Sequence, residues 1–510
     1  MMSFLSRKRF CIWIGLGAVV LAVCLSLINL EHGNLNQDEG WYLYAAKLVA
    51  AGQMPYQDFA FTQGPVFPFV YGAFYPVVER WGVAGGRAIT ALLGLSASFA
   101  AALLASRISS RNRLAVAVIT FLLVGCNVYQ SYFTTVVKTY ALCSLLMLSG
   151  FYLLSFYKHW WGCFSAGVLF ALSAGCRLSA GIILPLAGLW LLWQRREIKR
   201  GWIWFGIGGA FALLLAFAPF LLRSFEQTRF FLFDYHTGRE GGGALFKVGF
   251  VSRFVRAYFL LVLLTLWLLL RQKHAGPSDF KGMRPFLWIC GIAVSAVHFF
   301  APFPYDDYQV IIFPVFCAAL AGSLISSVKV ERVPRVLMFF LLVSVAGAFS
   351  SPINQDWFIR GRDRIWWERK EKSDLMLLRE AAAYVQANSP EESVLLTQDV
   401  YLAVEAGRDV PPGMEMGPFC FYPEMSDEQA EKMHLLNQSK LLEILSQGNE
   451  PMAAFSGYGL AIESPSLIEV SADRRAELET ALMKHYEADG VMKHFGQAHT
   501  TLRFFKKKAE

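Results

Sequence analysis

Long apolar runs recur from the N-terminus to about residue 350. They are about 17–25 residues long, the length that a helix needs to cross a bilayer. We expect about eleven spans on this ground, at 10–30, 83–106, 114–131, 138–157, 161–176, 179–194, 202–222, 253–270, 285–301, 308–327 and 334–351. The first run follows Arg7-Lys8-Arg9 as in a signal peptide, but it is longer than a typical signal core, so we expect a retained span. The pattern predicts a polytopic α-helical membrane protein over residues 1–351.

The apolar stretch at 161–194 is long enough for either one very long helix or two spans. A break at Gly175-Cys176-Arg177 keeps every basic cluster on the same side of the membrane. We therefore expect two spans there, with Arg177 at the outer end.

The pattern changes at residue 352, where apolar runs give way to short mixed segments. We expect helices at about 374–388, 426–447 and 472–487, and strands at 393–398, 452–459, 491–495 and 501–507, with a Pro/Gly loop at 410–418. Alternating helices and strands of this length indicate a small α/β domain. Residues 352–510 are thus predicted to be a soluble domain attached to the spans.

Composition and charge support this division. The chain is 55% hydrophobic and only 17% charged, whereas soluble domains carry roughly 25% charge. Residues 1–351 hold 29 Lys+Arg and 13 Asp+Glu, while residues 352–510 hold 18 and 26. A nucleic-acid binder would not divide its charge this way. The basic clusters between spans predict a cytoplasmic N-terminus, with the loop at 31–82 and the tail outside.

That first outside loop holds the strongest candidates for chemistry, the adjacent acids Asp38 and Glu39, with Asp58 further on. A carboxylate at the membrane surface can accept a proton from an attacking hydroxyl. The alternative is structural, since Asp followed by Glu also suits a helix N-terminus. Aromatic residues surround the acids, as in amphipathic helices that lie on a bilayer surface.

Several other polar residues are expected near the same side of the membrane. Arg177, Lys138 and Arg87 stand at span ends, where each could bind a lipid phosphate or anchor its helix. Tyr305, Asp306 and Asp307 could hold sugar hydroxyls or help to bind a divalent cation, or cap a helix. His298 is either functional or a packing histidine. The triple glycine at 241–243 suggests a gate or a flexible connector.

No cysteine or histidine cluster predicts a zinc site, and the nine cysteines mostly lie in or beside apolar runs, as buried cysteines do. Cys420 is alone in the tail, so we expect no disulfide within it.

The first loop resembles that of the GT-C glycosyltransferases. The residues that carry the resemblance are Asp38-Glu39-x-x-Tyr42, Gly52-x-x-Pro55-Tyr56-x-Asp58 and Gln63-Gly64-Pro65. They are most similar to the polyprenyl-phosphate-sugar-dependent group that includes protein O-mannosyltransferases and the aminoarabinose transferase of lipid A. The resemblance implies a GT-C fold, with Asp38 as catalytic base, Glu39 beside it and Asp58 as an assisting acid. Tyr42 and Gln63 would then contact the sugar or the acceptor.

The expected function is inverting transfer of a sugar from a polyprenyl-phosphate carrier to a hydroxyl of a lipid, glycan or protein, on the outer face of the cytoplasmic membrane. The scheme needs no cofactor, although a divalent cation is possible, and no complete metal site is evident. A lipid or solute transporter is one alternative, but the chain shows no inverted repeats and every acid falls at a span end or in a loop. A ligase or polymerase that uses polyprenyl diphosphate is another.

Overall fold

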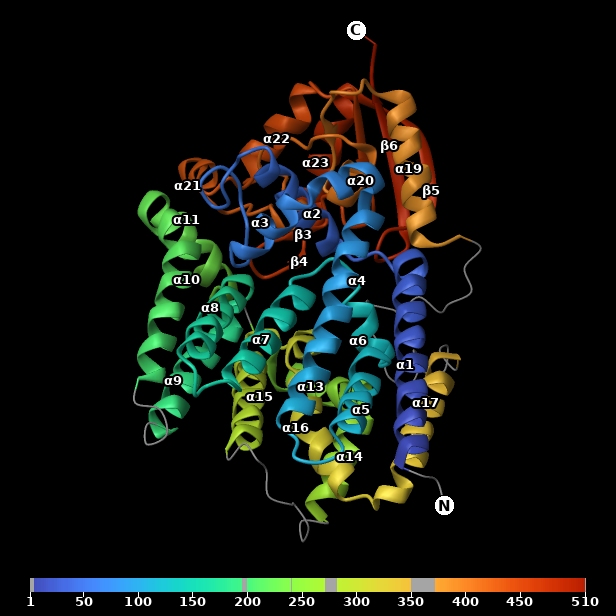
Figure 1. The fold of residues 1–510 in the computed structure, drawn as a ribbon. Helices are drawn as coiled ribbons and strands as arrows, with labels where there is room; N and C mark the ends of the chain where they lie inside the picture. The colour runs from blue at the N-terminus through green and yellow to red at the C-terminus, as the bar shows by residue number, and fades with distance from the viewer. Residues whose placement is uncertain (1–3, 195–199, 240, 271–281, 350–371, 510) are drawn as a thin grey trace.

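The computed structural model describes residues 4–194, 200–239, 241–270, 282–349 and 372–509. A bundle of helices forms most of the chain before residue 350, and the tail from residue 372 covers one end of it (Figure 1). The predicted boundary at 351 and 352 lies outside the described residues. The long bundle helices are α1 (Phe4–His32), α4 (Tyr75–Arg107), α5 (Arg113–Gly125), α7 (Tyr140–Leu154), α8 (Trp160–Cys176), α9 (Ile183–Trp193), α10 (Gly201–Arg223), α13 (Gly243–Ala257), α14 (Phe259–Leu270), α15 (Met283–Phe300), α16 (Phe313–Ser326) and α17 (Val333–Phe349).

The length and composition of these helices are those of a multi-pass membrane protein. In the described part of the chain four helices are long and apolar enough to cross a membrane, at 7–32, 75–107, 201–223 and 283–300. Two bent helix pairs raise this to six if each pair is one span, and four shorter apolar helices of 10–17 residues accompany them. The expectation of about eleven spans stays a prediction.

Several predicted spans are interrupted in the structure. The span expected at 114–131 is wrong as one helix, because α5 ends at Gly125 and Asn127 caps a short α6 (Val128–Phe133). The span expected at 253–270 is α13 followed by α14, which are bent by 84°. A 3-10 turn (Asp306–Ile311) precedes α16. The break expected at Arg177 is confirmed, since α8 ends at Cys176 and a 3-10 turn (Leu178–Ile182) leads into α9.

The first loop is folded and largely buried. It forms α2 (Gln37–Ala50), α3 (Val66–Ala73) and the start of α4, which bends at Gly82. The expectation of helices lying on the bilayer surface is wrong for α2, because the tail helix α20 (Val400–Ala406) packs against it. A Cβ on Gly40 would lie 2.4 Å from the backbone nitrogen of Tyr401. Glycine at this position therefore allows the close approach of the two helices.

The tail is the small α/β domain that the sequence predicts. The strands of its main sheet are β1 (Leu395–Leu396), β2 (Met452–Phe455), β5 (Tyr486–Phe495) and β6 (Thr500–Lys507). Their order in the sheet is β1-β2-β6-β5. The pair β1 and β2 is parallel, and the other two pairs are antiparallel. A separate hairpin pairs β3 (Ile462–Glu463) with β4 (Ile468–Glu469). The helices are α19 (Asp374–Asn388), α20, α21 (Asp427–Lys432), α22 (Gln438–Gln447) and α23 (Ala472–His485).

Several tail elements differ from the sequence prediction. The strand β5 begins at Tyr486 and not at 491, and β2 ends at Phe455 and not at 459. The strand expected at 393–398 is shorter, and α20 follows it directly. The helix expected at 426–447 is divided into α21 and α22, because the Asn437 side chain accepts from the Lys440 backbone nitrogen and starts a new helix. In Figure 1, α2 and α3 lie between the bundle and these tail elements. The predicted catalytic loop is thus enclosed from both sides.

Candidate functional site

A cavity of about 570 Å³ lies where the first loop, the bundle and the tail meet. Side chains from α2, the segment before α7, the 3-10 turn before α16, the segment that follows α10 and the tail line it. The structure brings eight of the twelve predicted site residues to its wall. These are Asp38, Tyr42, Gln63, Lys138, Arg177, Tyr305, Asp306 and Asp307.

Asp38 is placed by the way in which α2 begins. The Asn36 side chain accepts from the backbone nitrogen of Asp38, and the Glu39 side chain accepts from the backbone nitrogen of Asn36, which completes a capping box. The Asp38 carboxylate then faces the cavity, where its Oδ1 accepts from Trp41 Nε1 at 3.2 Å. Its Oδ2 lies 3.3 Å from Lys138 Nζ, and the side chain is 29% exposed. An accessible carboxylate at this place can accept a proton from a bound hydroxyl.

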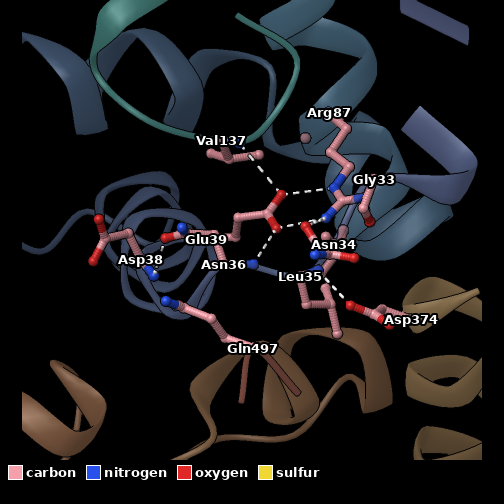
Figure 2. Close-up of polar contacts among 12 residues, drawn as sticks. Gly33, Asn34, Leu35, Asn36, Asp38, Glu39, Arg87, Val137, Asp374 and Gln497 are labelled. Atoms are coloured by element: carbon pink, nitrogen blue, oxygen red, sulfur yellow. Dashed lines mark hydrogen bonds and ion pairs between the residues drawn. The ribbon is translucent and has the colours of Figure 1, made fainter. Parts of the chain in front are cut away.

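Glu39 points away from the cavity and is bound by Arg87 (Figure 2). Both Glu39 oxygens accept from the guanidinium at 2.7 Å, and both side chains have no exposed surface. Arg87 also donates to the carbonyls of Leu30, Gly33 and Asn34 at 3.0–3.1 Å. The geometry corrects two predictions, the catalytic role of Glu39 and the phosphate-binding role of Arg87. Neither residue lines the cavity, and together they hold the start of α2.

Asp58 and His298 are also away from the cavity wall. The exposed Asp58 side chain accepts from the Met54 backbone nitrogen at 2.7 Å, so it stabilises its own turn. His298 is buried between Ser179 and Gln309, at 2.8 and 3.1 Å. The predicted roles of Asp58 as assisting acid and of His298 in substrate binding therefore find no support in the geometry. The packing alternative for His298 agrees with its position.

Asp306 and Asp307 are neighbours in sequence but have different partners. Asp307 Oδ2 lies 2.9 Å from Lys138 Nζ and accepts from the Tyr140 hydroxyl at 2.7 Å. Burial alone would raise the pKa of Asp307, but the Lys138 charge and these hydrogen bonds hold it below its ordinary value. Lys138 is consequently shared by two carboxylates, Asp38 and Asp307. Its charge is largely neutralised by them.

Asp306 pairs with cavity residues that sequence reasoning missed. Its Oδ1 accepts from Arg253 Nε at 2.6 Å, and its Oδ2 accepts from the Tyr129 hydroxyl at 2.6 Å. Arg239 and His236 also line the cavity and were missed as well. Arg239 and His236 lie between α10 and α13, and Arg253 lies on α13. The signal was the alternation of aromatic and basic residues beside the glycines.

Arg177 and Arg239 differ from Lys138 in having no carboxylate within ion-pair distance among the residues that the structure describes. The Arg177 guanidinium lies over the Tyr308 ring, 4.1 Å from its centroid, and donates to Thr139 at a long 3.5 Å. The Arg239 guanidinium lies 4.5 Å from the centroid of Tyr235, and its buried Nε has no hydrogen-bond partner in the described structure. Because no acid among the described residues neutralises them, these two guanidinium groups could bind an anionic ligand.

No group of three or more His, Cys, Asp or Glu side chains is arranged to hold a metal ion within the described ranges. The suggestion that Asp306 and Asp307 help to bind a divalent cation meets a geometric difficulty. Arg253 and Lys138 lie beside their carboxylates and compete with any cation.

His236 gives the site a testable dependence on pH. Its Nε2 donates to the Thr62 carbonyl at 2.8 Å. Burial, together with the charges of Arg239 and Arg177, lowers the pKa of His236 to about 4. An unfolded histidine titrates near 6.5, so the folded state loses stability as the pH falls from about 6.5 toward 4, by at most about 3 kcal/mol.

We expect the unfolding temperature of the wild-type protein in detergent to fall between pH 7 and pH 4.5. The fall should be smaller in a His236→Gln variant, which has no group to titrate there. Equal pH dependence in the two proteins would contradict the assignment.

No protein-family model and no curated protein matches the sequence. Solved structures do resemble the fold. The structure is similar to ArnT from Cupriavidus metallidurans in the apo state, with a TM-score of 0.63 and 14% identity over 96% of this chain and 97% of that one. It is also similar to the same protein bound to undecaprenyl phosphate, with a TM-score of 0.61, 12% identity, and 96% and 98% of the two chains covered. The chain therefore has the GT-C fold that the first loop indicated.

Proposed function

We propose that this protein is an inverting glycosyltransferase that takes its sugar from a polyprenyl-phosphate carrier on the outer face of the cytoplasmic membrane. One observation carries the proposal. A partly exposed carboxylate, Asp38, shares a cavity at the end of the helical bundle with two arginines that have no carboxylate partner among the described residues. A carboxylate to activate a hydroxyl and cations to hold a phosphate are the two parts that this transfer requires.

The donor phosphate is assigned to Arg177 and Arg239. Guanidinium groups bind phosphate in a fork of parallel hydrogen bonds, and both are half-buried, where such bonds are stronger than in water. Lys138 is the weaker candidate because Asp38 and Asp307 already lie beside its ammonium group. ArnT, whose fold this chain shares, has been seen bound to undecaprenyl phosphate. That observation on another protein supports the same ligand class here.

The reaction then follows from these positions. Asp38 takes the proton of the acceptor hydroxyl while that oxygen attacks the anomeric carbon, and the bond from the anomeric carbon to the phosphate oxygen breaks. The electron pair of the broken bond stays on the lipid phosphate, whose charge Arg177 and Arg239 stabilise. Attack and departure occur on opposite faces of the sugar, so the configuration at this carbon inverts. Tyr42, Gln63 and Tyr305 line the space between and are assigned to sugar or acceptor contacts.

The direct test is incubation of the purified protein with radiolabelled polyprenyl-phosphate sugars and a membrane extract that supplies lipid, glycan and protein acceptors. We expect label to move from one donor to an acceptor, with inversion at the anomeric carbon and release of polyprenyl phosphate. Transfer only from a polyprenyl-diphosphate donor would instead identify a ligase or polymerase. Passage of a lipid or solute across the bilayer without transfer would identify a transporter.

Replacement of Arg177 by glutamine tests the phosphate assignment. A hydrogen bond to a charged group is worth about 1.5–3 kcal/mol, so affinity for undecaprenyl phosphate should fall roughly 10- to 150-fold. Binding to the purified variant in detergent measures this. Arg229→Gln is the matched control, because that guanidinium is 63% exposed and paired with Asp234. Equal affinity in the Arg177 variant and the wild type would remove Arg177 from the site.

A further inference from the structure

The link between α1 and α2, together with the first residue of α2, is held from two sides. The backbone at Asn36 is extended, with φ −116° and ψ 135°. On the bundle side the Asn34 carbonyl accepts from Arg87 at 3.0 Å and the Asn36 nitrogen donates to Glu39 at 3.0 Å. On the tail side, the backbone amides of Leu35 and Gln37 donate hydrogen bonds to two side-chain acceptors (Figure 2).

These two acceptors belong to side chains more than 300 residues further along the chain. The Leu35 nitrogen donates to Asp374 Oδ2 at 3.0 Å, and the Gln37 nitrogen donates to Gln497 Oε1 at 2.7 Å. The second bond matters more for the site, because Gln37 is the first residue of α2 and Asp38 follows it. The first amides of a helix have no partner inside the helix and must find one elsewhere.

Gln497 is presented by a turn that is itself fixed in place. The turn joins β5 to β6 and includes Gly496, whose φ is +71°. A side chain at this position would place its Cβ 2.5 Å from the Tyr401 hydroxyl, so glycine allows the turn to pack against Tyr401. The Gly457 nitrogen donates to the Thr500 hydroxyl at 2.8 Å, which ties the end of the turn to the loop after β2. Gln497 also lines the cavity that contains Asp38.

We propose that Gln497 is a positioning residue for sugar transfer, acting through the Gln37 amide to fix the first turn of α2 and with it the Asp38 carboxylate. The β5–β6 turn is then part of the active site, although it lies in the predicted soluble domain. The inference rests on the proposed function, because it takes Asp38 to be the base. Misplacement of a catalytic group by about 1 Å can cost roughly 100-fold in rate.

The test compares three variants of the full-length protein. Gln497→Ala removes the acceptor oxygen, Gln497→Glu retains an oxygen at the same place, and Gln447→Ala is a control at an exposed glutamine of the tail. We expect Gln497→Ala to lower kcat by about 10- to 100-fold, with the KM for the donor unchanged. Gln497→Glu should recover most of the loss, and Gln447→Ala should behave as the wild type.

A second measurement does not depend on activity. Hydrogen exchange of the backbone amides at 36–40 should be faster in Gln497→Ala than in the wild type, and near the wild-type rate in the other two variants. Unchanged exchange and kcat in Gln497→Ala, or a Gln497→Glu variant as slow as Gln497→Ala, would overturn the proposal. If the wild-type protein transfers no sugar, the proposed function fails separately. The exchange comparison then decides alone whether Gln497 fixes the first turn of α2.

Discussion

The Asp38→Asn variant is expected to lose sugar transfer almost completely while it still folds and binds the lipid carrier. A general base contributes about 10²- to 10⁴-fold to a rate, so we expect kcat to fall about 1000-fold. Asparagine keeps the size of the side chain and can still accept from Trp41, whose Nε1 lies 3.2 Å from the Asp38 carboxylate. Only the capacity to take a proton, and the charge beside Lys138, are removed.

Asp58→Asn is the matched control for this prediction, because Asp58 is an exposed acid in the same loop and its side chain only stabilises a local turn. It should transfer sugar at close to the wild-type rate. Binding of undecaprenyl phosphate to the Asp38→Asn protein should remain within a few-fold of wild type. Full transfer activity in that variant would show that another group takes the proton.

The membrane part of the fold could be read from the sequence because its signal is local. Apolar runs of span length locate most helices, and the break at Arg177 follows from charge placement. The errors arise where a short polar cap competes with an apolar run. Asn127 and Asn437 each start a new helix inside a stretch that length alone would make continuous. Both are N-cap residues, and that signal was present in the sequence.

The candidate site could be predicted only in part. Asp38, Lys138 and Arg177 were expected on one side of the membrane, and they do share the cavity. The choice between catalysis and helix capping for Asp38 and Glu39 was left open. In the structure Asp38 lines the cavity, whereas Glu39 caps the start of α2 and binds Arg87. Asn36 followed by Glu39 three residues later is the pattern of a capping box, which favoured the structural role for Glu39.

The remaining contacts depend on the tertiary fold and have no local signal. Glu39 meets Arg87 from 48 residues away, and Gln37 meets Gln497 from 460 residues away. The sequence alone does not show that the tail encloses the first loop, since each part has its own apolar pattern. Arg239 and Arg253 lie on either side of the triple glycine at 241–243, which was interpreted as a gate or connector. Only the fold shows that both residues line the same cavity as Asp38.

Loss of either partner of the Glu39–Arg87 pair is expected to destabilise the protein strongly. Both side chains are fully buried, and their two nitrogen–oxygen contacts are 2.7 Å. Removal of one partner leaves an uncompensated charge in the interior, which costs about 3–5 kcal/mol. Glu39→Gln and Arg87→Met should each lower the unfolding temperature in detergent and the yield of folded protein. Arg475→Met, which breaks an exposed pair with Glu479, should leave the unfolding temperature unchanged.

The double variant Glu39→Gln/Arg87→Met separates the pair's own contribution from the penalty of an isolated charge. Each single variant is expected to be unstable mainly because it leaves one unpaired charge in the interior. The double variant leaves none, so its loss of unfolding free energy should be smaller than the sum of the two single losses. Strictly additive losses would show that the two side chains act independently. Wild-type stability of either single variant would contradict the buried ion pair itself. Because Arg87 also binds the carbonyls of Gly33 and Asn34, the double variant should still be less stable than the wild type.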